Sequence, residues 1–131
     1  MESARLGSGM SEEASGIREV IDLLGCEVIW GEERLAEMSV SACFAADLMS
    51  EVLAFSEPEA LLITGLVNVQ AIHTADVAEM RAILFVNGKR PGGDVLALAK
   101  ERGIPLLTTK LTMFEACGIL HANGLKASSR S

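Results

Sequence analysis

Polar residues and glycines follow four apolar segments of the chain, and these residue types are suited to holding a small ligand. They are Asp47 and Ser50 after the first segment, Thr64, Gly65, Asn68 and Gln70 around the end of the second, Asn87, Gly88 and Lys89 after the third, and Thr108 and Thr109 at the end of the fourth. In an open α/β sheet, ligands bind outside the carboxyl ends of the strands, where free N–H groups at helix starts also attract anions. We therefore predict a ligand-binding rim for a small metabolite or nucleotide.

The same residue types also have purely structural uses, because turns between strands and helices favour Gly, Asn, Asp and Thr. Asp47 precedes the helical segment 48–55 and is expected to cap it. Lys89 is either a solvated loop charge or a contact for an anion. His73 and His121 each stand alone on an apolar helical face, where a core or rim histidine is the simpler interpretation. The ligand-binding and structural interpretations both stay open at this point.

The sequence patterns of phosphate loops and nucleophile elbows do not occur in this chain, so we predict no catalytic residue and no cofactor. Gly88-Lys89 lacks both the first glycine and the final Ser or Thr of a phosphate-binding GxxxxGK[ST] loop. The nucleophile-elbow pattern GxSxG is also missing. The alternative is a small group-transfer enzyme that uses Asp47, Lys89 and the hydroxyls of the Thr108-Thr109 pair.

Composition limits the partners of this 131-residue chain. Its net charge of −7 argues against nucleic acid and against an anionic membrane surface, and no apolar run reaches the ~18 residues of a membrane helix. Cys26, Cys43 and Cys117 are odd in number and widely spaced, which predicts neither a metal site nor a disulfide framework. We expect a cytoplasmic protein. Because 50% of its residues are hydrophobic, we also expect a homo-oligomer, most simply a dimer.

Apolar periodicity predicts the elements that must position the rim. A helical stripe runs from Ile17 to Leu24 and ends at Gly25. Further helices are expected at 48–55, 68–81 with a break at Thr74, 94–103 and 112–124, and strands at 26–30, 39–45, 60–64, 82–86 and 104–109. Their alternation favours a three-layer α/β/α fold with a mostly parallel or mixed sheet of about five strands. We expect one domain over 15–126, after a disordered lead at 1–14 and before a polar tail at 127–131.

Four stretches of the chain carry a recognisable pattern: ADLMSEVLAF at 46–55, LITGLVNVQ at 62–70, FVNGKRP at 85–91 and MFEACG at 113–118. Together they resemble the small stand-alone DRTGG-domain proteins, over about Ile17 to Lys126, although the letters DRTGG do not occur. The resemblance implies a fold similar to the N-terminal domain of HPr kinase/phosphorylase and a non-catalytic regulatory or assembly module that forms dimers. Stand-alone members resemble accessory proteins of iron-only hydrogenase systems in anaerobes, which implies a protein partner.

Overall fold

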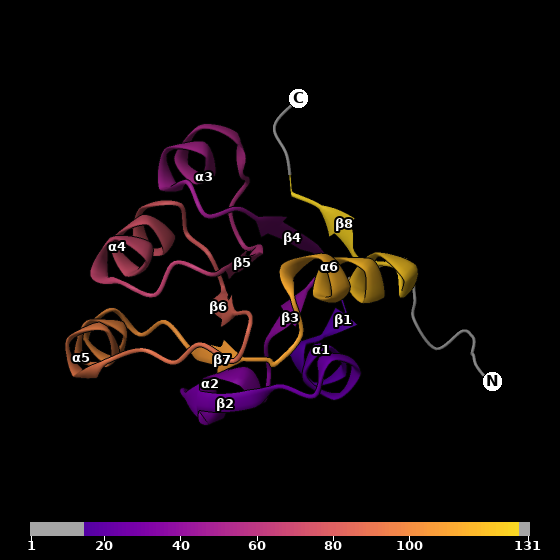
Figure 1. Cartoon of the computed structure of the whole chain (residues 1–131), viewed down its shortest axis with the longest axis horizontal. Helices are drawn as coiled ribbons and strands as arrows, with labels where there is room; N and C mark the ends of the chain where they lie inside the picture. The colour runs from indigo at the N-terminus through magenta and orange to yellow at the C-terminus, as the bar shows by residue number, and fades with distance from the viewer. Residues whose placement is uncertain (1–14, 129–131) are drawn as a thin grey trace.

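The computed structural model describes residues 15–128, which form three layers around a six-stranded sheet. Helices α3 (Met49–Phe55), α4 (Val69–Val77) and α5 (Gly93–Arg102) cover one face, and α1 (Ile17–Leu24) and α6 (Met113–Ala122) cover the other (Figure 1). This arrangement confirms the predicted α/β/α fold class. The predicted lead at 1–14 and the last three residues of the predicted tail lie outside the described residues.

The sheet is parallel except at one edge. Its strands are β2 (Glu27–Trp30), β4 (Ala42–Ala45), β5 (Leu61–Thr64), β6 (Ala82–Phe85), β7 (Leu106–Thr108) and β8 (Lys126–Ala127). They lie in the order β2-β7-β6-β5-β4-β8, and only β2 runs antiparallel to its neighbour. The carboxyl ends of β4, β5, β6 and β7 therefore meet at one edge of the molecule. The predicted ligand-binding rim requires this arrangement.

The two central strands are apolar throughout because helices cover both of their faces. Every residue of β5 and β6 is buried, which is the pattern expected of a parallel strand between two helical layers. Successive side chains point to opposite faces, so Leu61, Ile63 and Leu84 pack with α1 and α6. Leu62 and Ile83, in contrast, pack with α3, α4 and α5. The sheet therefore has two cores, one on each side.

Helix ends follow several of the sequence signals. Thr112 caps α6 in a capping box, in which its hydroxyl accepts from the Glu115 N–H while the Glu115 carboxylate accepts from the Thr112 N–H. Gly25 and Gly103 end α1 and α5 in the left-handed conformation, which glycine adopts without strain.

Several predicted boundaries are wrong, each because of a tertiary contact. The predicted strand 39–45 is divided at Ser41: β3 (Ser39–Val40) pairs with β1 (Ser15–Gly16) in a separate sheet, while β4 joins the main one. The predicted break at Thr74 does not occur, because α4 continues through this residue. Thr74 is 5% exposed and belongs to the buried side of the helix.

Two segments assigned to loops or tail are ordered elements. The segment after β2, where neither a helix nor a strand was predicted, contains the short helix α2 (Glu32–Leu35), which is anchored by the fully buried Leu35. Part of the predicted polar tail forms β8, whose Lys126 N–H donates to the Ser41 carbonyl and adds a parallel strand beside β4. Pairing with β4 continues to Ser128, whose N–H donates to the Cys43 carbonyl at 2.8 Å.

A pair of glycine substitutions tests the packing of β2 against β7. Gly31 has φ of +94°, and an added β-carbon would lie 2.9 Å from the Pro105 α-carbon, whereas the left-handed Gly25 faces open space. We expect Gly25→Ala to lower the free energy of unfolding by about 1–2 kcal/mol through backbone strain. Gly31→Ala should cost about 1–3 kcal/mol more through the added clash. Urea denaturation measures both, and equal losses would contradict this account of the contact.

Candidate functional site

The carboxyl ends of β4 and β5 are joined by a side chain that follows β4. The Asp47 Oδ1 atom accepts a hydrogen bond from the Gly65 N–H at 2.7 Å and another from the Thr64 hydroxyl at 3.0 Å. Asp47 therefore holds the turn after β5. The prediction that it caps the helix at 48–55 is wrong, because the N-cap of α3 is Leu48 and that helix start has no side-chain hydrogen bond.

Lys89, which follows β6, reaches the same turn from the other side. Its Nζ donates to the Gly65 carbonyl at 3.0 Å. A β-carbon placed on Gly65 would lie 3.5 Å from Asp47 Oδ1 and 3.6 Å from Lys89 Nζ, so a carboxylate and an ammonium flank this glycine. Both charged residues are exposed. We call Asp47, Thr64, Gly65 and Lys89 the Gly65 cluster.

The Gly65 cluster can recognise groups of both polarities. The carboxylate can accept further hydrogen bonds from a ligand hydroxyl or ammonium group, and the ammonium can donate to a phosphate or carboxylate. The backbone contacts of both side chains limit the positions they adopt before any ligand arrives. Such preorganisation lowers the entropic cost of binding.

The hydroxyls predicted at the end of β7 are already committed to backbone carbonyls. Thr108 donates to the carbonyl of Lys89 at 2.7 Å, and Thr109 donates to the carbonyl of Leu24 at 2.7 Å. Both threonines are buried. Thr108 thus positions the loop that carries Lys89, and Thr109 ties the end of α1 to the end of β7. Their role in ligand binding stays a prediction.

A cavity of about 400 Å³ lies beside the Gly65 cluster, at the β7–β2 side of the same edge. Gly88, Thr108 and Thr109 line it, together with residues that the sequence did not single out, including Glu27, Arg90 and Lys110. Arg90 donates to both carboxylate oxygens of Glu27, at 2.9 and 3.0 Å. This contact holds the pKa of the Glu27 carboxyl below its usual range. We call this cavity the Arg90 pocket.

The sequence offered one signal for Arg90, which is its place directly after Lys89 in the loop that follows β6. The partner was not apparent, because Glu27 lies 63 residues away. Arg90 and Lys110 extend the positive charge beyond Lys89 along the ends of β6 and β7. One carboxylate, Glu27, faces them in the same pocket.

The remaining predicted residues have separate positions. Asn68 caps α4 by accepting from the Ala71 N–H at 3.1 Å. Asn87 and Gly88 form a left-handed turn with φ of +62° and +67°, and their N–H groups donate to carbonyls of the loop after β7. Ser50 and Gln70 are exposed on α3 and α4. Asn68, Asn87 and Gly88 thus have structural roles here, as the second interpretation of these residue types allowed.

The histidines and cysteines do not form a metal centre. His73 and His121 are both exposed rather than in the core. Within residues 15–128, no group of three His, Cys, Asp or Glu side chains could hold a metal ion. The three cysteines are free and half-buried, and burial raises the pKa of Cys26 and Cys43 to about 12. No helix among these residues is long and apolar enough to cross a membrane.

Comparisons with known proteins identify the type of domain. A family model, the DRTGG domain, matches residues 19–122. No curated protein matches the chain significantly. Among solved structures, the chain resembles the CBS and DRTGG domains of the regulatory region of Clostridium perfringens pyrophosphatase, complexed with the activator diadenosine tetraphosphate, at 19% identity and a TM-score of 0.67. The match covers 84% of this chain and 47% of that one, so it spans about half of the larger structure.

Removing the Asp47 carboxylate tests whether it holds the ends of β4 and β5 together. We expect Asp47→Ala to lower the free energy of unfolding by about 1 kcal/mol, because Gly65 and Thr64 lose a charged acceptor. Asp47→Asn keeps an acceptor oxygen and should cost less. Asp22→Ala, at an exposed position of α1, is the control and should change stability by no more than about 0.5 kcal/mol. Equal losses for Asp47→Ala and Asp22→Ala in urea denaturation would refute this role.

Proposed function

The chain belongs to the DRTGG-domain family, and we propose that it is a non-catalytic regulatory module that binds a small anionic metabolite or nucleotide at the carboxyl ends of its strands. One observation carries this proposal. Asp47 and Lys89 are held on either side of Gly65, where the ends of β4, β5 and β6 meet. Such sheet edges are the usual ligand sites of open α/β folds.

The charges around this edge favour a nucleotide over a simple anion. Lys89 would donate to a phosphate group, while the Asp47 carboxylate would accept from a hydroxyl such as those of a ribose. The adjoining Arg90 pocket, at about 400 Å³, lies within the size range of small-molecule sites. The nucleotide activator in the structurally similar pyrophosphatase region makes nucleotides the first ligands to test.

The contacts favour regulation over group transfer. A transferase built on this edge would need a nucleophile or base within reach of Asp47 and Lys89. The hydroxyls of Thr108 and Thr109, which would supply it, are buried and donate to backbone carbonyls. A ligand at this edge would therefore be bound rather than transformed, and its presence would be passed to a partner.

Two kinds of protein partner complete the proposal. The first is a second copy of the chain, because Phe114 at the start of α6 exposes 88% of its surface. The second is a component of an anaerobic, hydrogenase-type system, supported by the resemblance to its stand-alone accessory proteins. A cytoplasmic location agrees with three free cysteines, since disulfides are rare in that compartment.

Calorimetric titration with adenine nucleotides, including diadenosine tetraphosphate, tests the ligand site. We expect saturable binding that Lys89→Ala weakens by about tenfold or more, because one charge-assisted hydrogen bond is lost. Lys100→Ala, in the last turn of α5, removes an equal charge away from the strand ends and should leave the affinity unchanged. Absence of binding to every nucleotide, or equal weakening by both variants, would overturn the proposed function.

Sedimentation velocity tests the dimer. We expect the wild-type chain to sediment as a dimer and Phe114→Ser to shift it toward the monomer, because the exposed ring would be lost from the interface. Val77→Ser removes another exposed apolar side chain, 72% accessible on α4, and should leave the dimer intact. A monomeric wild type, or unchanged sedimentation of the Phe114→Ser variant, would exclude the surface around Phe114 as a dimer interface.

A further inference from the structure

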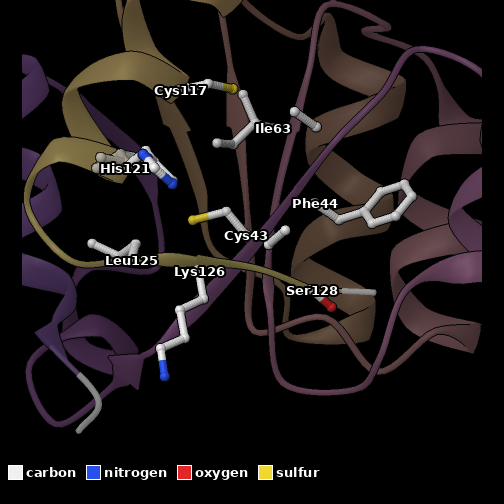
Figure 2. A pocket seen from close by; sticks show the side chains of 11 residues that line it. Cys43, Phe44, Ile63, Cys117, His121, Leu125, Lys126 and Ser128 are labelled. Carbon is white, nitrogen blue, oxygen red and sulfur yellow. The ribbon is translucent and has the colours of Figure 1, made fainter. Parts of the chain in front are cut away.

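A second cavity, of about 410 Å³, opens beneath α6 at the opposite edge of the sheet from the Arg90 pocket. We call it the α6 pocket, and its lining includes Cys43, Ile63, Cys117, Leu120, His121 and Lys126. Figure 2 shows Cys117 and His121 descending from α6 toward Cys43 and Ile63 on the strands below. The Gly65 cluster contributes no residue to this cavity.

The α6 pocket exists because small side chains face one another across it. Ala45 and Cys43 of β4, Ala127 of β8 and Cys117 of α6 leave space between this helix and the edge of the sheet. On the same face, nearer to α1, larger side chains such as Ile17 and Leu107 fill the corresponding space. Protein interiors normally close such gaps. At about 410 Å³, the α6 pocket falls within the range of ligand sites.

The wall formed by β8 is firmly attached, so the pocket does not depend on a loose end of the chain. The Lys126 N–H donates to the Ser41 carbonyl at 3.0 Å, and the Ser128 N–H donates to the Cys43 carbonyl at 2.8 Å. The Ser128 hydroxyl also accepts from the Glu57 N–H at 2.9 Å. The pocket is therefore preformed, which is typical of small-molecule sites.

The lining is apolar inside and basic outside. Burial raises the pKa of Cys43 to about 12 and also raises that of Cys117, so both thiols are neutral at pH 7 and act as small hydrophobic groups. Ile63 and Leu120 add aliphatic surface. His121 and Lys126 are both exposed beside this pocket, and the Lys126 side chain points away from His121 (Figure 2). None of the residues that line the pocket is acidic.

We propose that the α6 pocket binds a small carboxylate with an aliphatic tail. The tail would occupy the space between α6 and β4, where it displaces water from apolar walls. The carboxylate would remain at the rim and accept a hydrogen bond from the His121 imidazole. The exposed Lys126 side chain would rotate toward the rim and bring its ammonium to the same carboxylate. This site is separate from the nucleotide site proposed above and does not depend on it.

Titration with decanoate, below its micellar concentration, tests the proposal on the full chain, with decanol as the uncharged analogue. We expect saturable decanoate binding that Lys126→Gln and His121→Gln each weaken by about three- to tenfold, the range for one partly exposed polar contact. Decanol should bind the two variants and the wild type equally. Lys100→Gln, which removes a lysine charge elsewhere on the surface, is the matched control and should bind both compounds normally.

Filling the cavity provides the second test. Cys117→Phe places a ring in the pocket and should abolish binding of both compounds. If this variant does not fold, Cys26→Ser provides a substitute, because it leaves Cys43 and Cys117 in the pocket as the two remaining thiols of the chain. Bound decanoate should then slow the reaction of these two thiols with a thiol reagent. The proposal would be overturned if decanoate showed no saturable binding or bound a folded Cys117→Phe variant unchanged. It would also be overturned if Lys100→Gln and Lys126→Gln weakened binding equally, or if decanoate did not protect the thiols. If decanoate binds the monomer but not the dimer, the pocket is covered in the dimer. That result would instead assign the pocket to contact with a second copy of the chain.

Discussion

Burial of β5 and β6 on both faces is the constraint on which the rest of this molecule depends. Every side chain of these two strands is inside, between α1 and α6 on one side and α3, α4 and α5 on the other. Polar groups and the chain reversals can therefore emerge only at the strand ends. Because neighbouring strands from β4 to β7 are parallel, one end of the sheet gathers their carboxyl termini and the turns that follow them.

Side-chain hydrogen bonds to the backbone then fix this end of the sheet. Asp47 connects the end of β4 to the turn after β5, Lys89 connects the loop after β6 to that same turn, and Thr108 connects the end of β7 to the loop that carries Lys89. Each of these contacts crosses from one strand end to the next. The result is a continuous polar edge in which the exposed charges are positioned by the fold before a ligand binds.

The two cavities differ in the chemistry that they offer. The Arg90 pocket, at the β7–β2 side, has charged walls formed by Arg90, Lys110 and Glu27. The α6 pocket, at the β4–β8 side, has neutral walls and basic groups only at its rim. A chain with net charge of −7 thus presents cationic side chains beside both cavities. This distribution favours anionic ligands of different kinds, one polar and one with an apolar tail.

Local sequence determined the layered fold and most of the elements, because apolar periodicity and turn residues act over a few positions. The buried runs of β5 and β6, the glycine ends of α1 and α5 and the start of α6 at Thr112 were all apparent in this way. The division of 39–45 and the strand β8 depended on pairing with distant segments. The same holds for the site: the sequence identified Asp47 and Lys89 as strand-end residues, but only the packed sheet decided what they contact. Asp47 meets a turn 18 residues away and Arg90 meets a carboxylate 63 residues away, and such partners are set by strand order, which no local pattern encodes.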